Sequence, residues 1–162
     1  MMEESGIKGR FWRYGPLIAW MLMIFFASSD EFSAANTSRL IGPLLRWLFP
    51  NMSEETLTLI HLAIRKAAHF AEYGVLALLA ARAFSTSSKA WLRSRWIIAS
   101  FSLVVCYALL DEYRQSFVPT RTPSIWDSLL DTAGGVSALF ALTLWRALRK
   151  RFDRMNCGAQ PN

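Results

Sequence analysis

Apolar residues gather in four long blocks along this chain, separated by shorter polar and basic stretches. The blocks lie within residues 11–29, 53–84, 96–110 and 125–145, and each offers close to the ~20 residues that a helix needs to cross a bilayer. Neither a strand-like alternation nor an internal repeat interrupts them. The pattern therefore predicts an all-α fold, an integral membrane four-helix bundle.

Two segments near the N-terminus admit two interpretations each. A basic segment precedes 11–29, as in a signal peptide, but Trp20 and the length of the block favour a retained membrane helix. Basic and apolar residues alternate over 36–49, which predicts a short interfacial helix in the first extracytoplasmic loop, with a plain loop as the alternative. Ser53, followed by two glutamates, is typical of a helix N-cap, so a long helix is expected over 53–84.

The composition supports a membrane protein. Hydrophobic residues make up 53% of the chain and charged residues 19%, below the roughly 25% of soluble domains. Disordered and collagenous classes are excluded, and so is a disulfide framework, because the two cysteines have no C-x-x-C spacing. The net charge is +6, and the basic residues lie beside the apolar blocks, which indicates that they set the membrane topology. We therefore expect no nucleic-acid partner.

The basic residues are distributed unevenly between the connections. The two ends and the 82–95 connection hold twelve Lys and Arg against three acids, whereas 30–72 and 111–131 hold six against nine. The positive-inside rule places the first group in the cytoplasm, which predicts a multi-pass protein with both termini inside (N-in/C-in). The predicted organisation is a cytoplasmic N-terminus at 1–10, a single four-span domain at 11–148 and a basic cytoplasmic tail at 149–162.

Ionisable residues from three of the blocks fall at one depth. Counting from Arg82, Arg95 and Arg146 at ~1.5 Å per residue puts four of them about 20–24 Å above the inner boundary of a ~30 Å slab. These four are Lys66, His69, Asp111 and Asp131. Intramembrane ionisable residues usually face the protein interior and are functional. We predict a ligand-binding site formed by Lys66, His69, Glu72, Tyr73, Asp111, Glu112, Gln115, Arg121, Asp127 and Asp131.

A structural network is the alternative explanation for these charges. Lys66, Arg114 and Arg121 would then only neutralise the aspartates and hold short helices together. A bundle that needs only such contacts could use Ser and Thr at lower cost, so the set as a whole favours a site. Close helix packing is expected below this layer, at the small residues Gly134, Gly135 and Ala138.

Two motifs carry a resemblance to a known family. They are Lys66-x-x-His69-Phe70-x-x-Tyr73 and Asp111-Glu112-x-x-Gln115-Ser116-Phe117-Val118-Pro119-x-Arg121, followed by Asp127 and Gly134. Together with the Ser28-Ser29 pair, they resemble the VanZ-like family over roughly residues 16–145. The resemblance implies a small integral protein of the bacterial cytoplasmic membrane, in a family named for low-level teicoplanin resistance. The family pattern has Asn where this chain has Asp131.

Two hypotheses for function follow. In the first, the cations hold an anionic or zwitterionic cell-envelope ligand, so that the partners are membrane lipids and a lipid-linked wall precursor or a glycopeptide. In the second, the protein is a membrane enzyme in which His69 is the general base, oriented by Asp111 or Glu72, for a lipid-linked ester or phosphoester. We expect no cofactor and no metal, because no clustered histidine motif is present; a metal on His69, Asp111 and either Asp127 or Asp131 is the weaker variant. A transporter is disfavoured because the polarity stays in the outer half.

Overall fold

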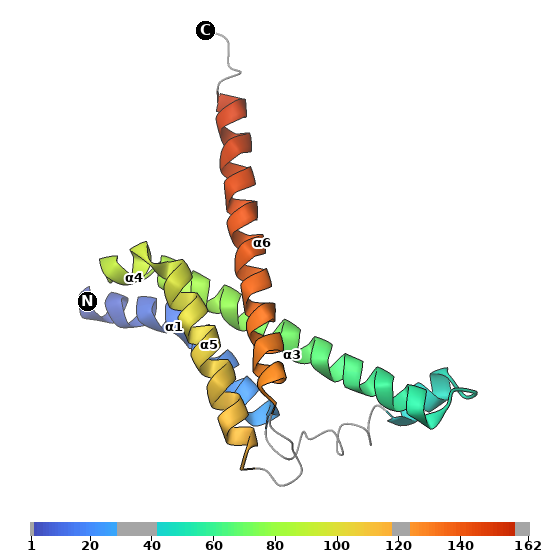
Figure 1. Cartoon of the computed structure of the whole chain (residues 1–162). Coiled ribbons are helices and arrows are strands. Elements are labelled where there is room, and N and C mark those ends of the chain that lie inside the picture. The colour runs from blue at the N-terminus through green and yellow to red at the C-terminus, as the bar shows by residue number, and fades with distance from the viewer. Residues whose placement is uncertain (1, 29–41, 118–123, 158–162) are drawn as a thin grey trace.

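All regular structure in the described part of the chain is helical. The computed structural model describes residues 2–28, 42–117 and 124–157. The all-α prediction is therefore confirmed for these residues. The helices are α1 (Met2–Ala27), α3 (Glu54–Ser85), α4 (Ala90–Ser94), α5 (Trp96–Gln115) and α6 (Ile125–Cys157), with a further helical segment at 42–48 (Figure 1).

The helix ends follow the local sequence rules where caps are present. The side chain of Ser53 accepts a hydrogen bond from the backbone N–H of Thr56 at 3.3 Å, so the predicted N-cap of α3 is confirmed. Helix α5 begins directly after Arg95, as expected. Of the predicted interfacial helix, residues 42–48 are helical and 36–41 lie outside the described residues.

Helices α1 and α6 are longer than their apolar blocks. Helix α1 begins at Met2 rather than near residue 11, and α6 continues to Cys157, twelve residues past the end of its block at 145. Apolar blocks mark the part of a helix that can be buried in an apolar environment, whereas polar helix formers such as Lys and Arg extend the backbone hydrogen bonding further. The predicted terminal segments 1–10 and 149–162 are thus largely continuations of helices.

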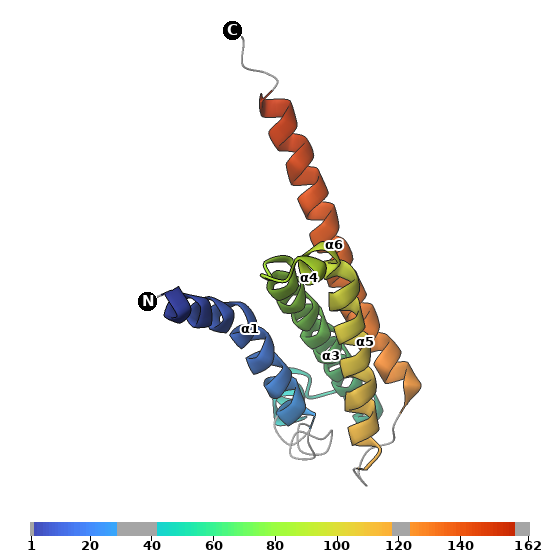
Figure 2. The ribbon, with the colours of Figure 1, turned by 90° about the vertical axis from the view of Figure 1, so that its left-hand side faces the viewer.

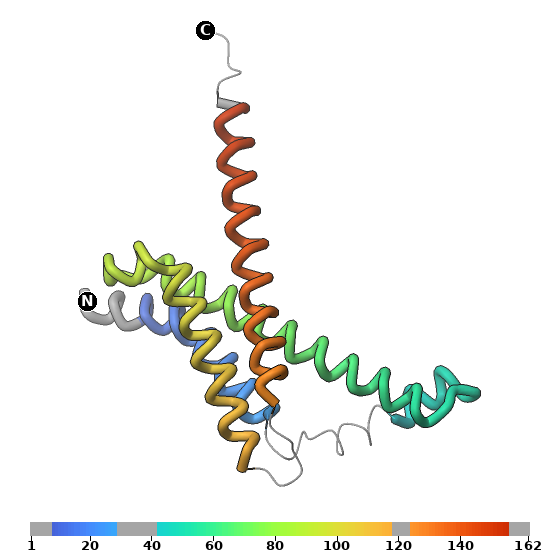
Figure 3. Tube along the Cα trace, viewed as in Figure 1, coloured from blue at the N-terminus to red at the C-terminus, as the bar shows by residue number. Residues whose placement is uncertain are grey.

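Four long helices meet around the middle of α3. Helix α6 crosses α3, while α5 and the second half of α1 pack beside them (Figures 1 and 2). Helix α1 bends near Pro16, whose ring removes a backbone donor and clashes with the preceding turn (Figure 2). The last part of α6 extends away from the other helices, as the trace in Figure 3 shows. The core between the helices includes Leu17, Ile24, Tyr73, Leu76, Ala77, Ala80, Val104, Ala108 and Leu139.

Two glycines of α6 allow it to pack closely against its neighbours, Gly134 against α3 and Gly135 against α5. A Cβ on Gly134 would lie 2.2 Å from the backbone oxygen of Phe70, and a Cβ on Gly135 would lie 2.6 Å from Cγ1 of Val104. Both glycines are buried. The prediction of close helix packing below Asp131 is therefore confirmed. The backbone of α6 packs against the backbone of α3 on one side and against a valine side chain of α5 on another.

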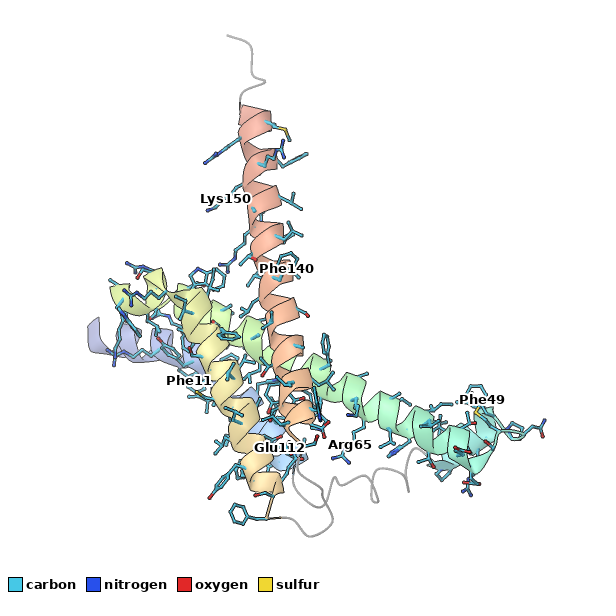
Figure 4. The ribbon with its side chains drawn as sticks, in the orientation of Figure 1. Phe11, Phe49, Arg65, Glu112, Phe140 and Lys150 are labelled. Carbon is cyan, nitrogen blue, oxygen red and sulfur yellow. The ribbon has the colours of Figure 1, made fainter. Side chains whose placement is uncertain are left out.

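The outer surface of the helices is strongly apolar. A contiguous exposed apolar surface of this kind marks contact with a membrane or another protein. Two helices, Trp96–Gln115 and Ile125–Met155, are long and apolar enough to cross a membrane by length and composition. The exposed apolar side chains include Ile18, Leu22 and Phe26 of α1, Val75 and Leu78 of α3, Ile97, Ile98 and Phe101 of α5, and Val136, Phe140 and Leu144 of α6, with Phe140 labelled in Figure 4.

We predict that Gly134→Ala destabilises the protein by about 1–3 kcal/mol, because the added methyl group overlaps the Phe70 backbone, which cannot rotate away. Thermal unfolding of the purified protein in detergent measures this effect. Gly9→Ala is the matched control: its Cβ meets nothing within 4 Å, and it should keep or slightly raise the stability. Equal melting temperatures for the two variants would contradict the close crossing.

Candidate functional site

Polar side chains from different helices converge where α6 begins and α5 ends, beside the middle of α3. Side-chain ligand atoms of His69, Asp111 and Asp131 all lie within 4.8 Å of one another. The Nδ1 atom of His69 is 3.9 Å from Oδ1 of Asp131 and 3.9 Å from Oε2 of Glu72. We call His69, Glu72, Asp111 and Asp131 the acid–histidine cluster.

Asp111 is the best-held member of the cluster. Its side chain is 2% exposed, and its Oδ2 accepts hydrogen bonds from Ser28 Oγ at 2.8 Å and from Gln115 Nε2 at 3.1 Å. Ser28 follows the last residue of α1, so one hydrogen bond ties α1 to α5. These two donors fix the orientation of the carboxylate. Its other oxygen, Oδ1, takes no part in either hydrogen bond.

Arg114 supplies positive charge beside Asp111. Its Nη1 lies 3.6 Å from Oδ1 of Asp111 and donates to the backbone oxygen of Phe25 at 3.2 Å. The guanidinium also stacks 3.5 Å above the Phe25 ring, a cation–π contact. Arg114 is therefore held between α1 and α5, where its charge offsets part of the negative charge of the cluster.

Tyr73 lies in the interior next to the cluster. It is fully buried, and within the described part of the chain its hydroxyl has no hydrogen-bond partner. It follows His69 by four residues, so it is on the same face of α3. The neighbouring Tyr107, whose ring centre is 6.4 Å away, instead donates to the backbone oxygen of Met21 at 2.5 Å.

The rim of the site is more exposed. Lys66 Nζ forms an ion pair of 2.9 Å with Oδ1 of Asp127, and both side chains are about half exposed. The carboxylate of Glu112 accepts a hydrogen bond from the backbone N–H of Ser124, which fixes the start of α6 (Figure 4). The predicted site residue Arg121 lies outside the described residues.

The structure thus brings most of the predicted residues together but gives them different places. Tyr73, Asp111 and Asp131 are buried and Lys66 is exposed, whereas the others are half-buried: His69, Glu72, Glu112, Gln115 and Asp127. Two of the pairings expected of a structural network, Lys66 with Asp127 and Arg114 with Asp111, are also present. The sequence prediction missed Ser28 as a site residue, although its place in a motif was the available indication.

Within the described residues, the interior of the site carries more negative than positive charge. Glu72, Asp111 and Asp131 face one histidine, and Arg114 is the cation beside Asp111. Buried like charges this close repel strongly in a low-dielectric interior. Such a site is suited to a cation, to a protonated group or to the positive end of a ligand.

Fold and site together define an all-helical protein with membrane-helix character and a polar interior. The model of the VanZ/LLP1 family matches residues 14–146, so the chain belongs to this family. The resemblance inferred from the motifs is thereby confirmed. Neither a curated protein nor a solved structure matches the chain.

We predict that Asp131→Asn raises the free energy of unfolding by about 1–2 kcal/mol in the absence of added ligands. The substitution keeps the side-chain volume and removes one of two buried like charges. Thermal unfolding in detergent at neutral pH measures the effect, and Asp153→Asn, at an exposed position on α6, is the control. A melting temperature below that of the control would show that Asp131 stabilises the fold, as a structural network requires.

Proposed function

We propose that this chain is a multi-pass protein of the bacterial cytoplasmic membrane in which α1, α3, α5 and α6 all cross the bilayer. Membership of the VanZ/LLP1 family and two helices of sufficient length and hydropathy support the proposal. The apolar outer surfaces of all four helices support it as well, because water is a poor solvent for so large an apolar area. Helices α1 and α3 carry the ionisable residues that lower their own hydropathy, and in α3 these include the site residues.

The orientation of the proposed topology follows from the basic residues. The segments with twelve Lys and Arg would be cytoplasmic, and the loops before α3 and between α5 and α6 would face outward. The acid–histidine cluster then lies in the outer half of the membrane, about 20 Å above the inner boundary. The Lys66–Asp127 pair would face the outer head-group region.

The proposed function is binding of an anionic or zwitterionic head group from a cell-envelope lipid or a lipid-linked wall precursor. The observation that carries it is the excess of acids over cations in the acid–histidine cluster, among the described residues, beside the half-exposed Lys66. A purely structural network would balance its buried charges more closely, since a buried unpaired charge costs several kcal/mol. The phosphate or carboxylate of the head group would meet Lys66, and a positive group would meet the acids.

The hydrogen bond of Ser28 bears on one catalytic arrangement only, that with a serine nucleophile, and a membrane enzyme with His69 as general base is the alternative proposal. Ser28 donates its hydroxyl hydrogen to Asp111, not to a histidine, so it is not arranged as an activated nucleophile. A contribution to glycopeptide resistance would follow if the ligand is a wall precursor.

The topology is tested by labelling single cysteines in intact cells, in a Cys106→Ser, Cys157→Ser background. Asn51→Cys, in the loop before α3, should react with a membrane-impermeant maleimide, whereas Ser88→Cys, in the 82–95 connection, should react only after lysis. Both positions are exposed, so burial does not explain a difference. Labelling of Ser88→Cys from outside would contradict the orientation.

The ligand is tested by mass spectrometry of lipids that co-purify with the full chain. We expect one phosphate- or carboxylate-bearing lipid to be enriched over the bulk membrane, and Lys66→Gln to reduce its occupancy by about tenfold, since one charge-assisted contact contributes ~1.5–3 kcal/mol. Lys150→Gln is the matched control, because Lys150 is also exposed and lies far along α6 (Figure 4). Equal occupancy in both variants would contradict a site at Lys66.

A further inference from the structure

We propose that His69, Asp111 and Asp131 bind one divalent transition-metal ion, Zn²⁺ or Mn²⁺. The three residues come from α3, α5 and α6, and their ligand atoms lie within 4.8 Å of one another. One imidazole nitrogen and two carboxylates form a common ligand set for such ions. This metal site lies within the ligand site proposed above. Only the identity of the head group that the ion would meet rests on that earlier proposal.

The distances are close to those that a bound ion requires. Ligands that each lie about 2.1 Å from one ion are at most about 4.2 Å apart. The separation of 3.9 Å between His69 Nδ1 and Asp131 Oδ1 already meets this limit. The two ligand atoms that are furthest apart would have to move about half an ångström closer to meet the same limit. Side-chain rotation can provide this movement.

The surroundings of Asp111 are those of a metal-binding carboxylate. Ligating carboxylates are usually hydrogen-bonded by neighbours that fix their orientation. Ser28 and Gln115 provide two such bonds to Oδ2, while Oδ1 is buried and, within the described residues, accepts no hydrogen bond. Asp111 therefore has one oxygen held by two hydrogen bonds, while the other has no hydrogen bond and lies 3.6 Å from Nη1 of Arg114, so that an ion would compete with this arginine for it.

Tyr73 gives a second, independent indication. Its side chain is fully buried, yet within the described residues its hydroxyl has no hydrogen-bond partner. A buried hydroxyl without a partner has lost its hydrogen bonds to water, and such groups call for an ion or water beside them. Because Tyr73 lies one turn after His69 on the same face of α3, a water bound to the ion is the partner that the proposal assigns to its hydroxyl.

The charges of the three proposed ligands match one divalent ion. Two ionised carboxylates and a neutral imidazole carry a charge of −2, which one such ion neutralises, and Glu72, 3.9 Å from Nδ1 of His69, adds a further acid beside them. Arg114 offsets only part of it, at 3.6 Å from Asp111, and Lys66 is paired with Asp127 at the rim. An ion with an open coordination position would also let this acidic site accept a phosphate or carboxylate oxygen, which the acids alone would repel.

The ligand types select the class of ion. Ca²⁺ prefers six to eight oxygen ligands, and Mg²⁺ prefers oxygen with retained waters. Imidazole instead suits Zn²⁺ and other transition ions, and carboxylates suit Mn²⁺. A set of one imidazole and two carboxylates therefore favours Zn²⁺ or Mn²⁺ over the two hard ions.

The test is ion binding to the full chain, purified in detergent with a tag that contains no histidine. The background is Cys106→Ser, Cys157→Ser, because thiols bind zinc. After chelator treatment, Zn²⁺ and, separately, Mn²⁺ are titrated against a fluorescent chelator. We expect one ion per chain, a Kd raised at least a hundredfold by His69→Ala or Asp131→Asn, and a Kd raised about tenfold by Ser28→Ala, which removes a support of Asp111.

His61→Ala is the matched control, because His61 is the other histidine of the chain and lies about 12 Å from His69 along α3. It should leave the Kd unchanged. Thermal unfolding checks the variants: zinc should raise the melting temperature of the parent protein and of His61→Ala but not that of Asp131→Asn, which should melt cooperatively without zinc. Less than one bound ion per chain, or equal Kd values for His69→Ala and His61→Ala, overturns the proposal.

The two proposals fail separately in a combined measurement. If a head group binds in a Lys66-dependent manner to chelator-treated protein and added Zn²⁺ or Mn²⁺ is not retained, the metal site is wrong and the lipid site stands. If one ion binds through His69 and Asp131 but no lipid is enriched, the metal site stands and the proposed function is wrong.

Discussion

The contact between the backbones of α3 and α6 is the constraint on which the site depends. Gly134 can approach the carbonyl of Phe70 only because it has no side chain. His69 directly precedes Phe70, and Asp131 lies three residues before Gly134, about one helical turn away. The crossing that brings the backbones together therefore also brings the imidazole to 3.9 Å from the carboxylate. A larger residue at 134 would separate the two helices and the two ligand groups at once.

A second constraint is that the helices carry apolar side chains on the outside and acidic side chains on the inside. The helices present Leu, Ile, Val and Phe outward, while Asp111 and Asp131 are buried. In a membrane this arrangement keeps the acids away from lipid, but it concentrates negative charge where the dielectric constant is low. Ser28 and Gln115 satisfy only one oxygen of Asp111. A bound cation would relieve this charge, and this is the feature on which the proposed binding site rests.

The sequence predicted the parts of this structure that depend on local rules. The Ser53 cap and the start of α5 after Arg95 follow from short-range chemistry, and the glycine pair at 134 and 135 indicated close packing. It did not predict where α1 begins or where α6 ends, because hydropathy does not limit backbone hydrogen bonding. It named a metal on His69, Asp111 and either Asp127 or Asp131 only as the weaker variant, since three residues from separate helices have no diagnostic spacing, and the structure brings together the set with Asp131. The equal depth of the three residues indicated that they lie near one another. Their distances also depend on how each helix is rotated about its axis, and this rotation is set by helix packing.

The crossing of α3 and α6 is tested most directly by a disulfide. A Cβ on Gly74 would lie 3.7 Å from Cβ of Ala138, close to the ~3.8 Å of a disulfide. In a background lacking the two natural cysteines, Gly74→Cys with Ala138→Cys should cross-link on mild oxidation, so that neither thiol reacts with a maleimide after denaturation. Gly74→Cys with Ala147→Cys, about 13 Å further along α6, should stay reactive. Free thiols at 74 and 138 in the folded, oxidised protein would contradict the crossing and the site built on it.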